Sequence, residues 1–517
     1  MNQSFNQELK AEIEEFRAFG HRFLKKEVTA AEFKAKSGGM GVYAQRGGEL
    51  FMIRLRMPSG VVSREHLELI HHYAQTYGLE KVHLTTRQTF QLHHLPIDAV
   101  CDIMEDALDH GLYTRGGGGN YPRNVALSPL SGVEPGEAFD VTPFALLAGE
   151  YFLSQITSYR LPRKLKVAFS NSRRDTANAR ATDLGFLAVR ENGAPRFEVW
   201  LAGGLGNGYA AGIPLGETID PREALYHVEA VTRLFIAEGD YENRARARLR
   251  YLPAKMGAEG FLSRYREHLA AVKAECRFPE LAAGAQENEI EQAPESDDLC
   301  LLPQKQKGKY TVLIHPRGGQ LGTGELNAVL EFLRPLEEAE VRLTMEESMA
   351  VRNLSEQKAR ELLALTKGFR AGTRVEQSVS CIGVPTCQIG IEKSEALLSA
   401  ILGELARNAE GARLLPQIHI SGCQNSCARH QLASIGFSGK RKRMGEEVVD
   451  AYELFLGGGA GSEDFRLARP AGTIPAAEIP KMIGEIAGVL QKKGLAFGDC
   501  LAAQEGELEA LISRYRI

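Results

Sequence analysis

Apolar and polar positions along this chain predict strands and helices in alternation. Two extended apolar runs, residues 50–56 and 310–315, each end at a turn rich in Pro and Gly. The first turn is followed by apolar residues at the spacing of one helical face, namely Leu67, Ile70, Tyr73, Ala74 and Tyr77. Each region therefore predicts the order strand, turn, helix, strand and helix.

The two regions also match each other in sequence. Residues 51–95 align without a gap with residues 310–354, so that Val82-His83-Leu84-Thr85 falls on Val341-Arg342-Leu343-Thr344. Residues 198–204 and 453–459 continue the series at a slightly different offset. An ordered series of this kind predicts duplication of a unit of roughly 200 residues. The alternative is a pair of unrelated domains that share the same order of strands and helices.

The duplication bears on the fold class. Alternating strands and helices predict a mixed α/β (α+β) fold, with the sheets of two repeats packed around a pseudo-twofold axis. Between the repeats, residues 279–298 are rich in Ala, Glu, Gln and Pro without a clear period, which indicates an exposed linker. A ligand is expected between the halves, because interfaces between domains form deep clefts.

Length and composition are typical of a folded protein with several domains. The chain has 517 residues, of which 44% are hydrophobic and 25% charged, so disorder, collagen and a membrane bundle are excluded. A formal net charge of -4 gives no overall basic field that would attract nucleic acid or an anionic membrane. No apolar run approaches the roughly 18 residues needed to span a bilayer, and the N-terminus is polar, so we expect a cytoplasmic protein.

Four of the eight cysteines form two pairs. Cys381 and Cys387 are separated by five residues, and Cys423 and Cys427 by three. Both pairs lie in loop sequence that can wrap thiolates around an inorganic core, and four thiolates suit a 4Fe-4S cluster or zinc. Structural zinc sites usually have tighter ligand pairs, so the wider spacing favours iron-sulfur. From spacing alone, zinc and unliganded core cysteines remain alternatives.

These pairs and the motifs before them carry a resemblance to a known family. The motifs are Thr85-Thr86-Arg87-Gln88-Thr89-Phe90-Gln91, Arg123-Asn124-Val125, Leu161-Pro162-Arg163-Lys164-Leu165-Lys166 and Ser421-Gly422-Cys423-Gln424-Asn425-Ser426-Cys427. In this order they resemble the siroheme-dependent sulfite and nitrite reductases over roughly residues 45–480, most of the chain. The internal duplication of that family is also similar to the repeat in this sequence.

The resemblance implies two cofactors, siroheme and a 4Fe-4S cluster. The implied cluster ligands are Cys381, Cys387, Cys423 and Cys427. The sulfur of Cys427 is further implied to bridge the cluster to the siroheme iron, which leaves the opposite face of the iron open for substrate. Arg87, Gln91 and Arg163 are implied to bind siroheme.

The resemblance also implies a catalytic set around the substrate, consisting of Arg54, Arg123, Lys164 and Lys166. Sulfite and nitrite are anions and siroheme carries carboxylates, so a buried site needs compensating positive charge. Lys164 and Lys166 are expected to donate protons during reduction. The alternative for each of these residues is a solvated surface side chain, and for Arg54 and Arg56 the polar outer face of an edge strand.

The same resemblance divides the chain into six segments. They are an N-terminal helical segment (1–45), a ferredoxin-like half-domain (46–120), a siroheme- and substrate-binding domain (121–278), a linker (279–305), a second ferredoxin-like half-domain (306–375) and a domain for the 4Fe-4S cluster and siroheme (376–517). At the repeat offset, Pro122 falls on Cys381 and Arg87 on Glu346. The two copies are therefore expected to have diverged into a substrate-binding half and a cluster-binding half.

Glycine runs and isolated histidines suggest no further cofactor. Residues 116–119 predict a flexible glycine loop, with an amide cradle for an anion as the alternative. No glycine run matches the dinucleotide fingerprint, so no NAD or FAD site is predicted. Four histidines are expected to be hydrogen-bonded structural residues rather than metal ligands, namely His93, His94, His419 and His430.

Electrons must come from another protein, because the sequence contains no flavin or nicotinamide module. Ferredoxin or a flavoprotein is the expected donor. Two basic stretches would attract an acidic ferredoxin, namely Arg244, Arg246, Arg248 and Arg250 together with residues 440–443. The alternative is that both stretches are ordinary solvated surface.

The expected reaction is the six-electron reduction of sulfite to sulfide. The pair Lys164 and Lys166 resembles the sulfite enzymes, because nitrite enzymes of the family usually place asparagine at the second position. Nitrite reductase, giving ammonia with the same cofactors, is the alternative. An alternative of another class is a non-enzymatic protein in which a zinc or iron-sulfur site only braces the second half.

Overall fold

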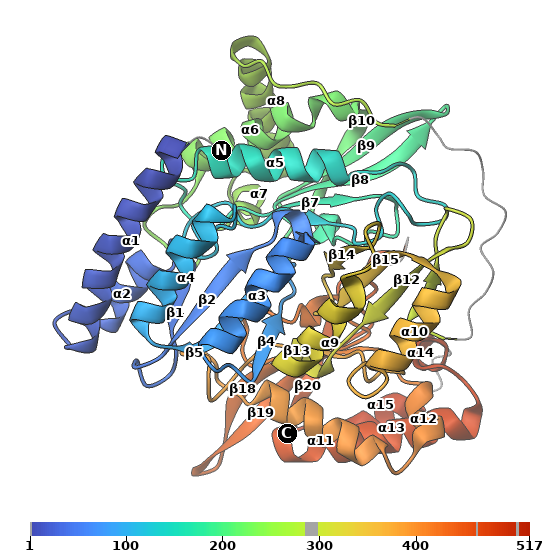
Figure 1. Ribbon diagram of the computed structural model, residues 1–517. Coiled ribbons are helices and arrows are strands. Elements are labelled where there is room, and N and C mark those ends of the chain that lie inside the picture. The colour runs from blue at the N-terminus through green and yellow to red at the C-terminus, as the bar shows by residue number, and fades with distance from the viewer. Residues whose placement is uncertain (1–2, 285–297, 462–463, 503–505) are drawn as a thin grey trace.

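Four five-stranded sheets build the protein, two in each repeat (Figure 1). The computed structural model describes residues 3–284, 298–461, 464–502 and 506–517. Two sheets hold the ferredoxin-like segments. The first contains β1 (Val42–Ala44), β2 (Phe51–Arg56), β5 (Thr89–Leu95), β4 (Lys81–Leu84) and β13 (Gln320–Gly322), in that order. The second contains β11 (Leu301–Pro303), β12 (Lys309–Ile314), β15 (Met349–Ser355), β14 (Glu340–Leu343) and β3 (Val61–Val62).

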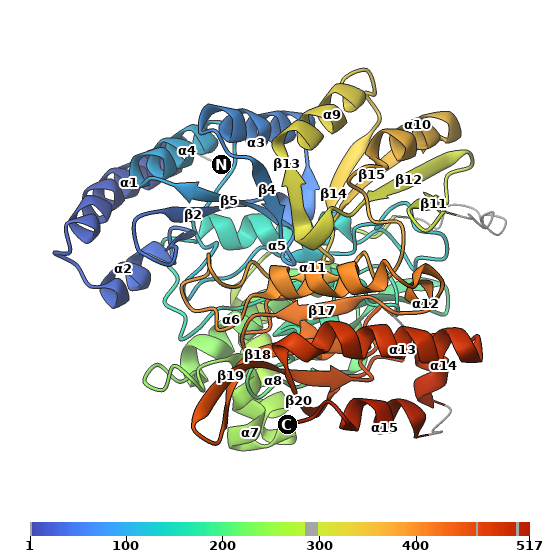
Figure 2. The same ribbon diagram turned by 90° about the horizontal axis from the view of Figure 1, so that it is seen from below.

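Each ferredoxin-like sheet takes its last strand from the other repeat. β13 pairs with β4, with Gln320 opposite His83, and β3 pairs with β14, with Val62 opposite Val341. The two units lie side by side in both views, and their apolar residues form one core (Figures 1 and 2). The exchange therefore ties the two predicted half-domains together.

Six helices pack on this joined pair of sheets. They are α1 (Gln3–Leu24), α2 (Ala30–Ser37), α3 (Arg64–Thr76), α4 (Ile97–Asp109), α9 (Thr323–Leu333) and α10 (Glu356–Thr366). The apolar face predicted for α3 is buried at Leu67, Ile70, Tyr73 and Ala74. Ser63 begins that helix by accepting a hydrogen bond from the His66 amide.

The other two sheets share one topology. Three parallel strands are followed by two antiparallel ones in both. One sheet contains β6 (Ala126–Leu127), β7 (Val167–Ser170), β8 (Leu184–Glu191), β9 (Ala194–Leu201) and β10 (Ile213–Ile219). The other contains β16 (Val379–Ser380), β17 (Ile418–Ser421), β18 (Ile435–Met444), β19 (Glu447–Leu456) and β20 (Arg469–Pro475). The predicted internally duplicated α+β fold is confirmed.

Helices complete the apolar core of each of these sheets. The first repeat contributes α5 (Thr142–Ser154), α6 (Ala224–Glu238), α7 (Leu252–Met256) and α8 (Ala258–Glu275). The second contributes α11 (Ser394–Leu405), α12 (Ala409–Arg413), α13 (Ile479–Lys493), α14 (Phe497–Ala502) and α15 (Glu507–Ser513). Figure 1 shows α11 and α13 together on one side of the strands of the second repeat, where the two helices pack against each other.

Two strands lie in segments that the sequence assigned otherwise. β1 belongs to residues 1–45, expected to be helical, and pairs with β2. β11 belongs to the expected linker 279–305 and joins the second ferredoxin-like sheet, because Cys300 and Leu301 are buried. Residues 285–297 of that linker lie outside the described residues. Within the described part of the chain, no helix has the length and apolar character needed to cross a bilayer, and the cytoplasmic location stays a prediction.

Candidate active site

The four paired cysteines lie in loops of the second repeat that start at one edge of a sheet. Cys381 follows β16, and Cys423 and Cys427 follow β17, its parallel neighbour. The sulfur of Cys381 accepts a hydrogen bond from the Gly422 amide at 3.1 Å. The sulfur of Cys423 accepts one from Asn425 Nδ2 at 3.4 Å. Donors of this kind stabilise thiolates and adjust the potential of a cluster that they hold.

The four thiols also interact electrostatically. Burial is the main cause that raises the pKa of Cys381, Cys387 and Cys423, and Cys427 is the second cause for each of them. Cys427 is the exposed member of the set. Thiols that oppose one another's ionisation fit a positively charged iron-sulfur core, which would hold all four as thiolates. Among the described residues, no three His, Cys, Asp or Glu side chains converge as they would around one metal ion.

Two of the predicted arginines converge on the glycine run of residues 116–119. Arg54 on β2 donates to the Gly117 carbonyl oxygen. Arg123 donates to the Gly118 carbonyl oxygen and, at 2.8 Å, to that of Gly119. The glycine run thus presents carbonyl oxygens to guanidinium groups, so it does not form an amide cradle for an anion.

The two predicted lysines project to one side of their segment. Lys164 and Lys166 flank Leu165, which is fully buried and bridges to Pro122. Burial lowers the pKa of both amines well below their usual value, and cations lower it further, with Arg248 foremost for Lys164 and Arg87 for Lys166. Within the described residues neither Nζ atom has a hydrogen-bond partner. Amines whose pKa is lowered in this way release a proton more readily than a solvated lysine does.

One hydrogen bond joins the cations of the first repeat to the cysteines of the second. Thr86 Oγ1 donates to the Cys427 carbonyl oxygen at 2.7 Å. Cys427 also interacts electrostatically with Arg54 and Lys164. It raises the pKa of both side chains, whereas burial lowers it. The structure therefore brings both predicted sets together at the boundary between the repeats.

Arg248 and Arg250 correct one prediction, because they are not part of an exposed docking patch. They are 8% and 9% exposed, whereas Arg244 and Arg246 are exposed. Arg248 Nη2 donates to both carboxylate oxygens of fully buried Asp183, at 2.8 and 2.9 Å. A basic residue at every second position suggested a solvated stretch. The apolar residues Ala247 and Leu249, which alternate with these arginines, were the available sign in the sequence that this segment is buried.

The buried cations allow a test of whether a polycarboxylate cofactor fits here. Eight arginines of the described residues have a buried guanidinium nitrogen without a hydrogen-bond partner. Four of them also interact electrostatically with one another beside the two lysines, namely Arg87 (Nε), Arg248 (Nε), Arg250 (Nη1) and Arg429 (Nε). A buried donor of this kind costs free energy unless an acceptor is bound. The carboxylates of siroheme are such acceptors, so the residues present fit that group.

The remaining predicted residues lie in the same region. Arg163 Nη1 donates to Asn120 Oδ1 at 3.3 Å, and its pKa is lowered by burial and then by Arg244. Gln91 lies opposite Arg54 in the first sheet. Tyr43 also belongs to this region and was not predicted. Its hydroxyl accepts a hydrogen bond from the Gly119 amide at 3.2 Å. Burial raises the pKa of this hydroxyl, whereas Arg123 and Arg54 lower it, and the net shift is downward.

The four histidines occupy ordinary environments. His94 Nδ1 accepts from Gln45 Nε2 at 3.2 Å, and His419 contacts the Arg429 carbonyl oxygen at 3.3 Å. His430 packs against Phe455, with ring centroids 4.8 Å apart. His93 contacts Gln91, as described below. Metal ligation by these histidines has no support in the described geometry.

Comparisons with known proteins agree with this arrangement. The family described as nitrite/sulfite reductase ferredoxin-like half domain matches residues 43–110, and the nitrite and sulphite reductase 4Fe-4S domain matches residues 118–273. The ferredoxin–nitrite reductase of Synechococcus elongatus is 29% identical over 450 residues, which cover 84% of this chain and 85% of that protein. The protein named sulfite reductase [ferredoxin] 1 of Mycolicibacterium paratuberculosis is 25% identical over 84% of this chain and 81% of its own.

A solved structure shares the fold. The NirA protein of Mycobacterium tuberculosis superposes with a TM-score of 0.79 at 23% identity, covering 94% of this chain and 92% of that one. Duplicated ferredoxin-like sheets, grouped thiols and buried cations together define a redox enzyme that acts on a small anion. Over most of its length this chain is similar to the siroheme-dependent sulfite and nitrite reductases. Its cofactors are siroheme and a 4Fe-4S cluster, so the zinc alternative and the non-enzymatic alternative are both set aside.

Proposed function

We propose that this enzyme reduces sulfite to sulfide, with the substrate bound among Arg54, Arg123, Lys164 and Lys166. The observation that carries this preference is the second lysine. Lys166 is held beside Lys164, and the pKa of each amine is lowered by burial and by surrounding cations. Two closely spaced amines stabilise a dianion such as sulfite more than the monoanion nitrite. The preference thus rests on local charge.

The proposed roles divide by side-chain chemistry. When bound, siroheme and the cluster supply the substrate-binding iron and the electrons. Arg54 and Arg123 orient the anion with planar guanidinium groups, which match oxyanions. Lys164 and Lys166 transfer protons to substrate oxygen, because a lowered pKa makes each protonated amine a stronger proton donor than a solvated lysine. Arg87, Gln91 and Arg163 bind siroheme.

The cysteines have separate proposed roles. Cys381, Cys387, Cys423 and Cys427 would hold the cluster, and Cys427 would in addition hold the siroheme. The exposure of Cys427 beside the cations of the first repeat supports this assignment. The matched 4Fe-4S domain covers the first copy of the duplicated unit, residues 118–273, whereas the four cysteines belong to the second copy.

Nitrite reduction to ammonia is the second candidate. It is supported by the names of several relatives, including the Synechococcus elongatus enzyme at 29% identity. Lys166→Asn tests the choice, because it removes the charge on which the sulfite preference rests. We expect the ratio of kcat/KM for sulfite to that for nitrite to fall about tenfold.

The same assay has a matched control. Arg246→Asn removes an exposed cation of the first repeat and should leave the ratio unchanged. An unchanged ratio in Lys166→Asn, or a greater kcat/KM for nitrite in the unsubstituted enzyme, would favour nitrite reductase.

Ferredoxin is the proposed donor, and relatives of both kinds are named for it. We propose that it docks at the loop after Cys387. Ile389 and Ile391 are 49% and 39% exposed there, and the exposed cations Arg46 and Lys393 flank them. Arg46 Nη2 donates to the Gly390 carbonyl oxygen at 2.7 Å, which fixes it beside the loop.

The basic stretch of residues 440–443 is a weaker candidate for docking. Lys440 pairs with Glu453 at 2.6 Å, and Arg441 lies 3.5 Å from Asp450. Lys442 donates to the Ile517 carbonyl oxygen at 2.7 Å. Partners on the same chain reduce the charge that an acidic donor would meet.

A further inference from the structure

A row of polar side chains behind Arg54 crosses three strands of the first sheet. Arg54 on β2 lies opposite Gln91 on β5, and Gln91 lies opposite His83 on β4. His93 is two residues beyond Gln91 on the same strand and therefore points to the same face. Gln91 is 6% exposed and His83 4%, so hydrogen bonds within the row are sheltered from water.

The Gln91 amide connects the two ends of this row. Of the two orientations of this amide, only one satisfies both of its sides: the oxygen then accepts from Arg54 Nε at 3.0 Å and from Arg54 Nη2 at 2.6 Å, and the nitrogen donates to His93 Nε2 at 3.3 Å. The reverse orientation would turn the amide hydrogens toward the guanidinium hydrogens, which repel them. An acceptor on His93 therefore favours the orientation in which Gln91 holds Arg54.

His93 can accept this bond only as a neutral imidazole. Burial lowers its pKa well below the usual value, and the groups that face it add to this effect. Those groups are His83 and Lys81 from β4, His94 from β5 and Arg54 from β2. In the neutral tautomer that carries its proton on Nδ1, Nε2 accepts the hydrogen bond from Gln91.

We propose that His93 is a positioning residue that acts through Gln91 to hold the Arg54 guanidinium toward the substrate anion. The proposal rests on the proposed role of Arg54 in substrate binding. The second repeat supports it by contrast, because the positions equivalent to Arg54, Gln91 and His93 are Leu313, Ala350 and Arg352. The row belongs to the substrate-binding half alone.

The test compares variants of His93 in the cofactor-loaded enzyme. His93→Phe and His93→Leu remove the acceptor, whereas His93→Gln keeps an oxygen near the position of Nε2. We expect both apolar variants to raise KM for the reduced anion about tenfold while kcat changes less than about threefold, as for loss of one hydrogen bond to a charged partner. His93→Gln should stay within about threefold of the unsubstituted KM. His94→Asn changes the exposed neighbour and is the matched control.

A second background separates positioning from general packing. In an Arg54→Gln enzyme, His93→Phe should have no further effect on KM, because two residues that act through one contact are not additive. Absorption bands of siroheme and cluster should be equal in all variants.

Three results would overturn the proposal. They are an unchanged KM in both apolar variants, an additive effect in the Arg54→Gln background, or loss of cofactors from both apolar variants. If the loaded unsubstituted enzyme turns over neither sulfite nor nitrite, the proposed function fails and the inference fails with it. If the unsubstituted enzyme turns over the anion but both apolar His93 variants keep its KM, the inference about His93 fails and the proposed function stands.

Discussion

The loop after β7 and the loop after β17 have the same backbone and different chemistry. Both contain two non-glycine residues with left-handed φ, Asp175 (56°) and Asn178 (57°) in the first repeat, and Ser426 (54°) and Arg429 (59°) in the second. Each loop leads into a short 3₁₀ turn, at Ala179–Ala181 and His430–Leu432. The equivalence extends over the whole loop.

The side chains of the two loops differ at the positions of the proposed cluster ligands. The positions of Cys423 and Cys427 are taken in the first repeat by Ser172 and Thr176. Thr176 Oγ1 lies 2.6 Å from Ser128 Oγ, so it is satisfied within its own domain. Duplication thus preserved a backbone that can present two side chains in one direction, and only one copy presents thiols.

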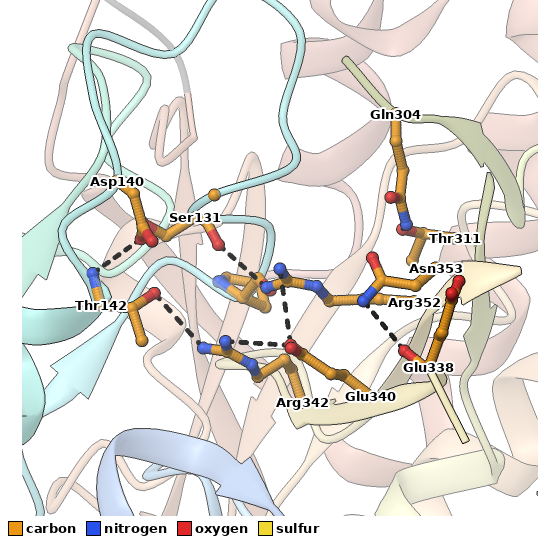
Figure 3. Close-up of polar contacts among 12 residues, drawn as sticks. Ser131, Asp140, Thr142, Gln304, Thr311, Glu338, Glu340, Arg342, Arg352 and Asn353 are labelled. Carbon is orange, nitrogen blue, oxygen red and sulfur yellow. Dashed lines mark hydrogen bonds and ion pairs between the residues drawn. The ribbon is translucent and has the colours of Figure 1, made fainter. Parts of the chain in front are cut away.

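The two ferredoxin-like sheets show a similar division. At the positions of His83 and His93 the second sheet carries Arg342 and Arg352, and both point toward the segment of the first repeat that holds Ser131 and Thr142 (Figure 3). Arg352 Nη1 donates to the Ser131 carbonyl oxygen at 2.9 Å, and Arg342 Nη2 pairs with Glu340 at 3.1 Å. Arg342 and Arg352 are therefore bound by acceptors of the protein through their terminal nitrogens, although the Nε atom of each has no partner among the described residues. We propose that the cations around Arg54 meet a small anion instead.

The largest expected effect comes from removing a thiol that only one repeat has. Cys427→Ser should abolish the absorption of siroheme coupled to the cluster and lower turnover by about three orders of magnitude or more, because loss of a metal ligand exceeds the loss from its supporting partners. Cys276→Ser, at a half-buried cysteine of the first repeat, should change neither property. Normal siroheme absorption and normal turnover in Cys427→Ser would contradict the claim that the loop of the second repeat holds the cofactors.

Arginines of the two sheets should respond in opposite ways. Arg54→Gln should lower kcat/KM about a hundredfold, because the proposed role of this guanidinium is to bind the substrate anion. The stability of the fold should change little, because burial already disfavours the charged form of Arg54 and lowers its pKa. Arg352→Gln should leave KM unchanged and lower the free energy of unfolding by about 2–3 kcal/mol, because it is 3% exposed and holds two carbonyl oxygens of the first repeat. Steady-state kinetics measure the first effect and urea denaturation the second. A loss of stability in Arg54→Gln with normal kcat/KM, or a raised KM in Arg352→Gln with normal stability, would contradict the comparison.

Electron delivery should depend on charge at the second repeat. Turnover supported by ferredoxin should fall severalfold as salt rises, and turnover supported by a small dye should not, because docking is electrostatic. Lys393→Glu should lower the ferredoxin rate about fivefold at low salt. Arg246→Glu in the first repeat is the control. Equal salt response for both donors would contradict docking by charge.

The smallest expected effect is a difference in acid stability. Burial lowers the pKa of His83 to about 4, whereas an unfolded histidine titrates near 6.5. Between these values the unfolded state binds the proton and the folded state does not, so stability falls as pH drops from about 6.5 to 4. His83→Gln should flatten the decline of Tm over this range. An unchanged slope would show that His83 is protonated in the folded enzyme.

Sequence alone indicated the duplication and the grouping of four cysteines, because both depend on spacing along the chain; the assignment of these cysteines as cluster ligands came from the family resemblance and stays a prediction. The paired cysteines and the matching runs at 51–95 and 310–354 remain visible without any knowledge of packing. The strand exchange was not predictable, since β3 and β13 are two and three residues long and too short to show a period.

The direction of individual cations also required the structure. Arg248 and Arg250 have the same sequence signature as Arg244 and Arg246, and only the fold brings Asp183 near Arg248. The contact of Gln91 with Arg54 and His93 depends on the register between β2 and β5, which one-residue slippage would destroy.

Cofactor analysis and turnover on one anaerobic sample test the central claim most directly. We expect roughly five iron atoms per chain, four in the cluster and one in siroheme. The same sample should show siroheme absorption and, with a reduced dye as donor, a higher kcat/KM for sulfite than for nitrite. A colourless protein that holds zinc on the four cysteines and reduces neither anion would contradict the account.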